Sequence, residues 1–331
     1  MRAMRLRNPD SIEARPLHES ESPQPEPGSG EVLVQVRACG ICHTDLHTIE
    51  GDIRPPSLPI TPGHQVVGNV VAVGDGVDNK HVGERVGIPW LYRACGRCEF
   101  CLRGEENLCR DAEFTGFHHD GGYAEYMIAD TSYTLAIPEN ISDELAAPLL
   151  CAGIIGYRSL QKADLEPGER LGLIGFGASA HLAIQVATYW NCQVFVFTRS
   201  HGHRELAASL GASWVGGIED EAPTQLDRAV LFAPIGSLVP LILGKLRPGG
   251  TLAINAIHLS PIPELPYHLI YGERTLRSVA NATYQDGVEF LQLAAKIPIH
   301  ATTSTYPLSE ANHALSDMKE SRLDGAGVLI P

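Results

Sequence analysis

The fold of this 331-residue chain is predicted most strongly by one stretch, Arg170-Leu-Gly-Leu-Ile-Gly175-Phe-Gly177-Ala-Ser-Ala180. Its first half is short and apolar, as in a buried strand, and its second half has the G-x-G-x-x-A spacing of a dinucleotide-binding turn. Gly175 permits the tight turn, Gly177 lets the backbone approach a pyrophosphate, and Ala180 lets the next helix pack closely on the strand. A glycine turn in an ordinary α/β unit is the alternative interpretation.

The residues after this turn supply the context that the motif requires. A helical pattern covers 181–190, and a second apolar strand follows at 193–198. Ala178 and Ser179 therefore stand at a helix N-terminus, where free N–H groups and the positive end of the helix dipole attract phosphates. The segment is predicted to bind a dinucleotide.

The same alternation of strand and helix continues along the chain. A helical pattern at 202–210 is followed by a strand at 228–233, a helix at 236–246 and a strand at 251–256. Such alternation builds a parallel sheet with right-handed crossovers. We therefore predict an α/β chain with a doubly wound, Rossmann-type nucleotide-binding domain over 154–286.

The end of the second strand indicates which dinucleotide is bound. An acidic residue there would hydrogen-bond a ribose diol and repel a 2′-phosphate, but this chain has Thr198-Arg199-Ser200. One cation and two hydroxyls suit a phosphate, so NADP is favoured over NAD. Arg199 stacked on an adenine or lying in solvent is the alternative, and NAD would then remain possible.

The first half of the chain is predicted to be rich in strands. Alternating or β-branched runs at 32–37 and 66–73 read as strands, with shorter ones at 123–129 and 132–137. Residues 1–30 are predicted to be a surface approach, and glycines at 74–76 and 83–87 predict turns. Helices at 287–296 and 309–319 and a strand at 327–330 are too few for a third domain, so we expect them to complete the first lobe.

Four cysteines in that half have the spacing of a structural metal site. Cys95, Cys98, Cys101 and Cys109 follow the pattern C-x2-C-x2-C-x7-C, and four thiolates suit one tetrahedral zinc with no open position. Free surface cysteines or an iron–sulfur cluster are the alternatives, but the spacing matches none of the common cluster signatures.

Three further residues suggest a second metal. Cys42 lies in a polar cluster, 39–47, that directly follows a strand; His64 precedes another strand; and Cys151 starts a helical pattern at 146–160. Cys151 read alone is a small buried hydrophobic residue more often than a ligand. Together the three form a Cys2His set, which leaves zinc one open position as in catalytic sites.

These pieces together resemble the zinc-dependent alcohol dehydrogenases of the medium-chain dehydrogenase/reductase superfamily. The matching motifs stand in the family's order and span nearly the whole chain: Cys39-Gly-Ile-Cys42-His-Thr-Asp, Pro62-Gly63-His64, the cysteines of 95–109, Leu150-Cys151-Ala-Gly and the turn at 175–180. The resemblance implies a GroES-like catalytic domain, made of 1–153 and 287–331 with a structural zinc lobe at 95–109.

The resemblance also implies the activity, which is reversible oxidation of primary or secondary alcohols by hydride transfer to NAD(P). Two zinc ions per chain would be bound, and the catalytic one would act as a Lewis acid. The resemblance implies that Cys42, His64 and Cys151 bind the catalytic zinc and that Asp45 orients His64. Thr44 would hydrogen-bond the alcohol, and His47 would release its proton. His43 would lie near the pyrophosphate of the cofactor.

Two positions depart from the family pattern. Gln65 stands where many relatives have a glutamate that is thought to approach the metal during ligand exchange, and a neutral amide is a weaker ligand. Asn281 stands near the position where some relatives have an arginine that contacts the cofactor phosphates. We expect the contact of Asn281 with these phosphates to be weaker.

Composition excludes several other functions. A net charge of −14 disfavours nucleic acid and anionic membranes as partners, which weakens the reading of 95–109 as a nucleic-acid-binding zinc ribbon. The chain is predicted to be cytoplasmic, because no apolar run spans a bilayer and its first residues lack the apolar core of a signal peptide. Reducing conditions there favour metal ligation by the cysteines over disulfides. The alternative functions are a catalytically impaired zinc-stabilised binding protein, a polyol dehydrogenase and an enone reductase. The resemblance also suggests that the chain forms a homodimer or homotetramer.

Overall fold

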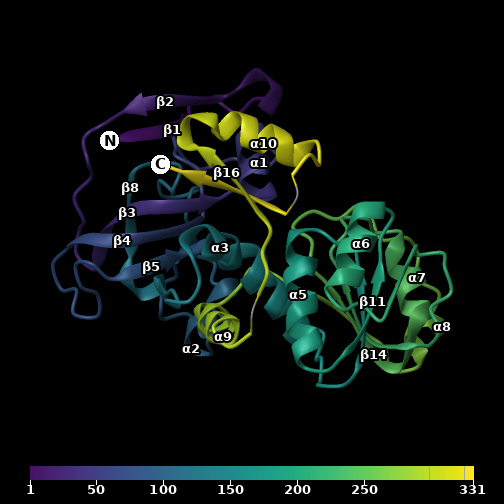
Figure 1. The fold of residues 1–331 in the computed structure, drawn as a ribbon. Helices are drawn as coiled ribbons and strands as arrows, with labels where there is room; N and C mark the ends of the chain where they lie inside the picture. The colour runs from purple at the N-terminus through teal and green to yellow at the C-terminus, as the bar shows by residue number, and fades with distance from the viewer. Residues whose placement is uncertain (298, 324) are drawn as a thin grey trace. The chain divides into compact units, whose positions relative to one another are not determined.

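The computed structural model describes residues 1–297, 299–323 and 325–331. The chain forms two compact units (Figure 1). The first contains Met1–Cys151, Ala282–Lys296 and His300–Pro331, and the second contains Ala152–Asn281 with Ile297 and Ile299. The predicted α/β class is confirmed.

The first unit is built on a seven-stranded sheet in the order β16-β17-β3-β4-β5-β9, with β8 paired to β3. Strands β3 and β4 lie side by side (Figure 1), and their antiparallel register places Gly40 opposite Gln65. Cys42 follows the end of β3 and His64 precedes the start of β4, so this register brings both residues to the same end of the sheet. The strands are β3(Glu31–Gly40), β4(Gln65–Val73), β5(Arg85–Ile88), β8(Tyr126–Asp130), β9(Leu135–Ala136), β16(Thr303–Pro307) and β17(Ala326–Ile330).

Helices and short ladders complete this unit. The helices are α1(His43–Glu50), α2(Glu99–Leu102), α3(Asp143–Pro148), α9(Tyr284–Ala294) and α10(Ala311–Lys319), with 3-10 turns at Ile12–Ala14, Glu106–Leu108, Thr131–Tyr133 and Leu308–Glu310. The ladders pair β1(Arg2–Leu6) with β2(Leu17–Glu21) and β6(Leu91–Arg93) with β7(Glu113–Phe114). The core of the unit includes the apolar side chains of β3 and β4.

Three local predictions for this unit were wrong. The strand predicted at 132–137 is only the short β9, because the 3-10 turn Thr131–Tyr133 comes before it. Residues 1–30 are not only a surface approach, because they contain the β1–β2 hairpin. The strand β2 is largely exposed and its sequence, LHESE, is polar, so no apolar alternation marks it. The turn predicted at 83–87 is shorter than expected, because β5 begins at Arg85.

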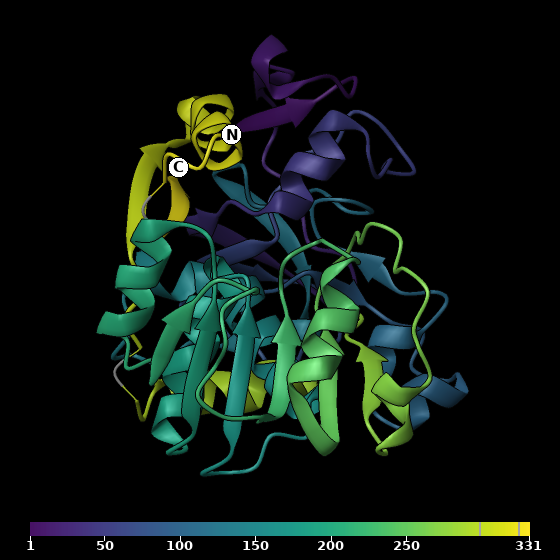
Figure 2. The same cartoon turned by 90° about the vertical axis from the view of Figure 1, so that its right-hand side faces the viewer.

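The second unit has a six-stranded sheet in which every neighbouring pair is parallel (Figure 2). Its order, β12-β11-β10-β13-β14-β15, is the 3-2-1-4-5-6 order of doubly wound nucleotide-binding sheets. The elements are α4(Ile154–Lys162), β10(Arg170–Ile174), α5(Ala178–Tyr189), β11(Gln193–Phe197), α6(His201–Ser209), β12(Trp214–Gly216), β13(Leu226–Leu231), α7(Leu238–Lys245), β14(Leu246–Ile254), α8(His268–Tyr271) and β15(Thr275–Ser278).

An ion-pair network fixes the amino ends of three neighbouring strands of this sheet. Asp227, near the start of β13, accepts from Arg170 Nε at 2.7 Å and from Arg170 Nη2 at 2.9 Å, and also pairs with Arg247. The hydrogen bond from Arg170 holds the pKa of Asp227 well below its usual range, against the opposing effect of burial. Because a carboxyl with a depressed pKa stabilises the fold only while it is ionised, its contribution is present above the unfolded pKa, about 3.9, and is lost as the pH falls below that value.

We expect Asp227→Asn to lower the free energy of unfolding by about 2 kcal/mol at pH 7, the usual size for lost hydrogen bonds to charged groups. The difference from the parent should shrink below about pH 4, where Asp227 begins to take up a proton in the unfolded chain. Urea unfolding at pH 7 and pH 3.5 measures both values, and Glu221→Gln, which neutralises an exposed carboxylate of the same unit, serves as control. A difference that grows at low pH would contradict this account.

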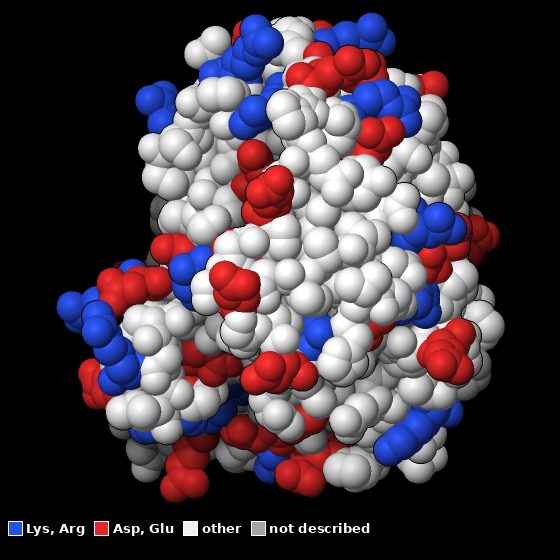
Figure 3. Space-filling view, turned by 90° about the vertical axis from the view of Figure 1, so that its left-hand side faces the viewer, with Lys and Arg blue, Asp and Glu red and all other residues white. Residues whose placement is uncertain are grey.

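Two properties of the surface bear on partners. Figure 3 shows a face of the molecule on which basic and acidic side chains are interspersed among uncharged ones. Within the described parts of the chain, no helix has the length and apolar character needed to cross a membrane.

Candidate active site

The predicted ligands Cys42, His64 and Cys151 come together in the first unit. Their ligand atoms all lie within 4.8 Å of one another, and the two sulfur atoms are 3.9 Å apart. Cys42 is the residue before α1, and His64 is the residue before β4. Three residues that are far apart in sequence therefore form one compact donor set.

His64 has one ring nitrogen satisfied and one without a partner. Its Nδ1 lies 2.8 Å from Asp45 Oδ1, and an ionised carboxylate can only accept, so Nδ1 carries the hydrogen in this pair. Its Nε2 is buried and has no hydrogen-bond partner among the described residues. A neutral imidazole protonated on Nδ1 offers a lone pair at Nε2, which is the form that binds a metal.

Asp45 is itself held in place by the backbone around the ligands. Its Oδ2 accepts from Cys42 N–H at 2.9 Å and its Oδ1 accepts from Gly63 N–H at 3.2 Å. Gly63 has a φ of +101°, and a Cβ there would lie 2.4 Å from a ring carbon of Tyr123. This position therefore requires glycine, and the carboxylate connects two of the three ligand-bearing segments.

The charges of the site favour a cation among these ligands. Burial lowers the pKa of His64, but the charge and hydrogen bond of Asp45, with help from Cys42, outweigh burial and raise the pKa to about 10, so without a metal the ring holds a proton at Nε2 that a bound metal ion would displace. The Cys151 thiol and His64 hold the pKa of Cys42 well below its usual range, although burial opposes them. Two thiols and an imidazole fit zinc with one coordination position left open.

A π-helical turn presents Cys151. The sequence pattern predicts a helix over 146–160, and the structure has α3, then a π-helical turn at Leu149–Gly153, then α4. Pro148 directly precedes this turn and has no N–H to donate to the α-helical ladder. Single π turns within helices are frequent at functional sites, and here the turn carries the third ligand.

The predicted relay residues lie on α1. Thr44 is buried, and its Oγ1 is 3.8 Å from Cys42 Sγ. His47 lies one turn further along and is partly exposed, whereas His43 at the start of the helix is exposed. Cys39 is fully buried and lies outside the ligand set.

The second donor set consists of the four cysteines of the zinc lobe. Their sulfur atoms lie within 4.8 Å of one another, with Cys95–Cys101 at 3.9 Å and Cys98–Cys101 at 3.5 Å. A tetrahedron with zinc–sulfur bonds of about 2.3 Å has sulfur–sulfur edges of about 3.8 Å, so the cluster has the right size for zinc. Backbone N–H groups of Arg97 and Cys98 lower the pKa of Cys95 to about 6, which favours a thiolate ligand.

An aromatic cluster lies against the ligand His64. The Trp90 ring meets the His64 ring edge to face at 4.9 Å and stacks on Phe114 at 4.9 Å, and Phe117 lies 6.0 Å from Trp90. Leu91, the residue after Trp90, is buried. Phe117 gives no signal in the sequence beyond its glycine-flanked loop.

The predicted nucleotide-binding residues lie in the second unit, at the carboxyl ends of its parallel strands. Gly175 follows β10 with a φ of +87°, and a Cβ there would lie 2.9 Å from Ala233 N. A Cβ on Gly177 would meet nothing within 4 Å, so its backbone is open to a ligand at the start of α5. This open helix N-terminus, formed by Ala178, Ser179 and Ala180, fits a pyrophosphate.

The end of β11 carries the residues that were predicted to choose the cofactor. Thr198 is buried, and Ser200 is the N-cap of α6, with its hydroxyl accepting from His203 N–H at 3.4 Å. Arg199 is exposed and forms no ion pair within the described part of the chain. Asn281 follows β15 at the same edge of the sheet, in a left-handed conformation with φ +51°.

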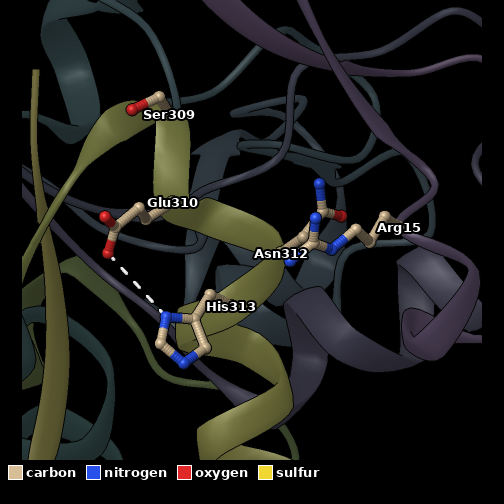
Figure 4. A pocket seen from close by; sticks show the side chains of 5 residues that line it. All are labelled: Arg15, Ser309, Glu310, Asn312 and His313. Atoms are coloured by element: carbon tan, nitrogen blue, oxygen red, sulfur yellow. Dashed lines mark ion pairs between the residues drawn. The ribbon is translucent and has the colours of Figure 1, made fainter.

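A pocket elsewhere in the first unit contains none of these residues. It is lined by Arg15, Ser309, Glu310, Asn312 and His313 (Figure 4). His313 Nδ1 and Glu310 Oε2 are 3.8 Å apart there, and Asn312 is fixed by two hydrogen bonds to the backbone of Leu17.

Comparisons with known proteins agree on one family. Residues 28–139 match the family model described as the alcohol dehydrogenase GroES-like domain. The chain is 45% identical to a probable alcohol dehydrogenase of Mycobacterium tuberculosis, over 100% of this chain and 97% of that protein. Its structure is similar to that of a cinnamyl alcohol dehydrogenase of Sorghum bicolor, with TM-score 0.90, 29% identity and coverage of 99% and 97%. It is also similar to a cobalt- and zinc-bound thermostable alcohol dehydrogenase of Pyrobaculum aerophilum, with TM-score 0.89, 25% identity and coverage of 100% and 99%.

Proposed function

The chain belongs to the alcohol dehydrogenases of the medium-chain dehydrogenase/reductase superfamily, and we propose that it oxidises apolar primary alcohols with NADP and two zinc ions per chain. Its activity as an alcohol dehydrogenase, with zinc and a nicotinamide cofactor, follows from the family. The substrate, the preference for NADP, the zinc count and the residue roles are parts of the proposal. The observation that supports it most is the Cys2His donor set, in which the buried His64 Nε2 has no hydrogen-bond partner among the residues that the structure describes.

The residues of the first unit have distinct roles in this proposal. Zinc held by Cys42, His64 and Cys151 supplies a Lewis acid that lowers the pKa of an alcohol hydroxyl, and nicotinamide supplies the hydride acceptor. Asp45 fixes His64 so that Nε2 points at the two thiols. Thr44, whose Oγ1 is next to Cys42 Sγ, orients the substrate hydroxyl and receives its proton. His47, further along α1 and partly exposed, passes the proton towards solvent.

The preference for NADP rests on Arg199. Its guanidinium is exposed and unpaired within the described residues, directly after the second strand of the nucleotide-binding sheet. A 2′-phosphate would supply the charge-assisted hydrogen bonds that Arg199 lacks. Neither Thr198 nor Ser200 carries a negative charge that would repel this phosphate.

The substrate class rests on the aromatic cluster beside His64. Trp90, Phe114 and Phe117 present ring faces and edges that favour apolar, and especially aromatic, substituents. The cinnamyl alcohol dehydrogenase of Sorghum bicolor, whose name indicates an aryl-substituted alcohol, is among the structures similar to this chain.

The assembly and location are part of the same proposal. We expect a homodimer or homotetramer, because β15 is the last strand of the sheet in the second unit, and Tyr267, the N-cap of the nearby α8, and Tyr271, its last residue, are exposed. Light scattering on the purified protein measures the assembly, and a monomer would contradict the expectation. The cytoplasmic location stays a prediction from the cysteine content.

A rate comparison on zinc-analysed protein tests the function. NADP+ and NAD+ are each combined with ethanol, benzyl alcohol and a secondary alcohol, and zinc per chain is measured on the same sample. We expect two zinc ions, the highest kcat/KM with NADP+ and benzyl alcohol, and slower reaction with NAD+. Inactivity of all six pairs at full zinc content would show a zinc-stabilised binding protein instead.

A substitution at Arg199 tests the preference for NADP. Arg199→Asp should lower kcat/KM for NADP+ by about a hundredfold, since charge-assisted hydrogen bonds contribute about 1.5–3 kcal/mol each, and should leave NAD+ unchanged or improved. Arg7→Asp, which makes the same change at an exposed position of the first unit outside both metal clusters, is the control. An unchanged ratio of the two cofactors would reject the role of Arg199.

A further inference from the structure

The end of α1 brings an acidic side chain to His47. Gly51 ends the helix in the left-handed conformation with φ +86°, and its N–H donates to His47 O at 3.1 Å. The N–H of Ile53 donates to the same carbonyl at 3.2 Å. These two bonds turn the chain back over the last helical turn, and His47 Nδ1 then lies 2.8 Å from Asp52 Oδ2.

This contact decides which nitrogen of His47 carries a hydrogen. An ionised carboxylate only accepts hydrogen bonds, so the hydrogen in the pair is on Nδ1, and a neutral imidazole has no second N–H. Nε2 is therefore the free acceptor.

We propose that Asp52 is a positioning residue of the proton relay, which holds His47 with Nε2 free to accept the substrate's proton and receives the Nδ1 proton in exchange. The ring gains one proton at Nε2 and releases one from Nδ1 along the 2.8 Å hydrogen bond, so the step is balanced. The exposed carboxylate then passes the proton to water. The inference rests on the proposed function, in which His47 belongs to the relay.

Two substitutions at Asp52 test this role. Asp52→Asn and Asp52→Ala should each lower kcat for alcohol oxidation by about tenfold, because positioned proton-transfer groups contribute 10²-fold or more and His47 itself remains. The solvent deuterium isotope effect on kcat should rise, because proton release becomes slower. Added formate should restore the rate of Asp52→Ala, by replacing the missing carboxylate, and should not restore Asp52→Asn.

Matched controls separate a proton-transfer role from a structural one. Glu310→Gln removes the carboxylate of another surface histidine–acid pair, His313–Glu310, and should leave kcat and the isotope effect unchanged (Figure 4). Zinc content and melting temperature should stay at parent values in both Asp52 variants. A kcat and an isotope effect within twofold of the parent would overturn the proposal.

The failure of this inference is distinguishable from the failure of the proposed relay. If His47→Gln leaves kcat unchanged, His47 is not in the relay and the proposed function is wrong at that point. If His47→Gln slows the reaction but the Asp52 variants do not, only the inference about Asp52 is wrong. The double variant should be no slower than His47→Gln alone, because both changes interrupt the same path.

Discussion

His64→Ala is expected to lower kcat/KM by at least about a thousandfold, because a Lewis-acidic metal contributes several kcal/mol of transition-state stabilisation and about 4 kcal/mol corresponds to that factor. The variant removes the only nitrogen donor of the Cys2His set and leaves Asp45 buried without its main partner. Zinc per chain should fall from two to one. Metal analysis and steady-state kinetics on the same preparation measure both effects.

Two further variants make this test specific. His81→Ala removes an exposed histidine of the same unit and should keep both zinc ions and full activity. Asp45→Asn keeps all three ligands but replaces the carboxylate that accepts from His64 Nδ1, so zinc affinity should fall by about 10–100-fold, the usual range for such partners. If His64→Ala retained two zinc ions, the assignment of the metal site would be wrong.

The second large effect is expected from the zinc lobe. Cys98→Ser removes one of four thiolates from a segment whose only α-helix, α2, buries no residue in the described structure. Because metal binding by such a site supplies about 10 kcal/mol or more of folding free energy, the lobe should unfold locally when its zinc is lost. The catalytic ligands are other residues, so one zinc per chain should remain.

Limited proteolysis reports this unfolding directly. Arg97, Arg103 and Arg110 lie in or beside the lobe, so trypsin should cut Cys98→Ser there at concentrations that leave the parent intact. Cys192→Ser changes a buried cysteine that belongs to neither metal cluster and should resist trypsin like the parent. Equal resistance of Cys98→Ser would show that the lobe does not depend on zinc.

The nucleotide-binding fold could be predicted from local patterns. The turn at 175–180, with a strand before it and a helix after it, predicts β10 and α5, and the structure has both elements. The hairpin of β1 and β2 could not be predicted, because β2 is polar and largely exposed and shows no apolar alternation.

The sequence motifs predict which residues form the metal site, but they do not predict how the backbone brings these residues together. The family resemblance names Cys42, His64 and Cys151, and the structure shows the β3–β4 register and the π-helical turn that bring them together. The contact of Asp52 with His47 was missed, because it depends on the conformation of Gly51 rather than on a residue pattern. Contacts of this kind need backbone geometry as well as sequence.

The zinc ligands are synthesised before the other parts of the chain that complete the first unit. All seven candidate zinc ligands lie between Cys42 and Cys151, whereas α9, α10, β16 and β17 of the same unit come from residues after 281. At a synthesis rate of about 5–20 residues per second, roughly six to twenty-five seconds separate the synthesis of Cys151 from that of β15, the last strand of the nucleotide-binding sheet. Metal can therefore be taken up by a nascent chain that does not yet contain a nucleotide-binding sheet.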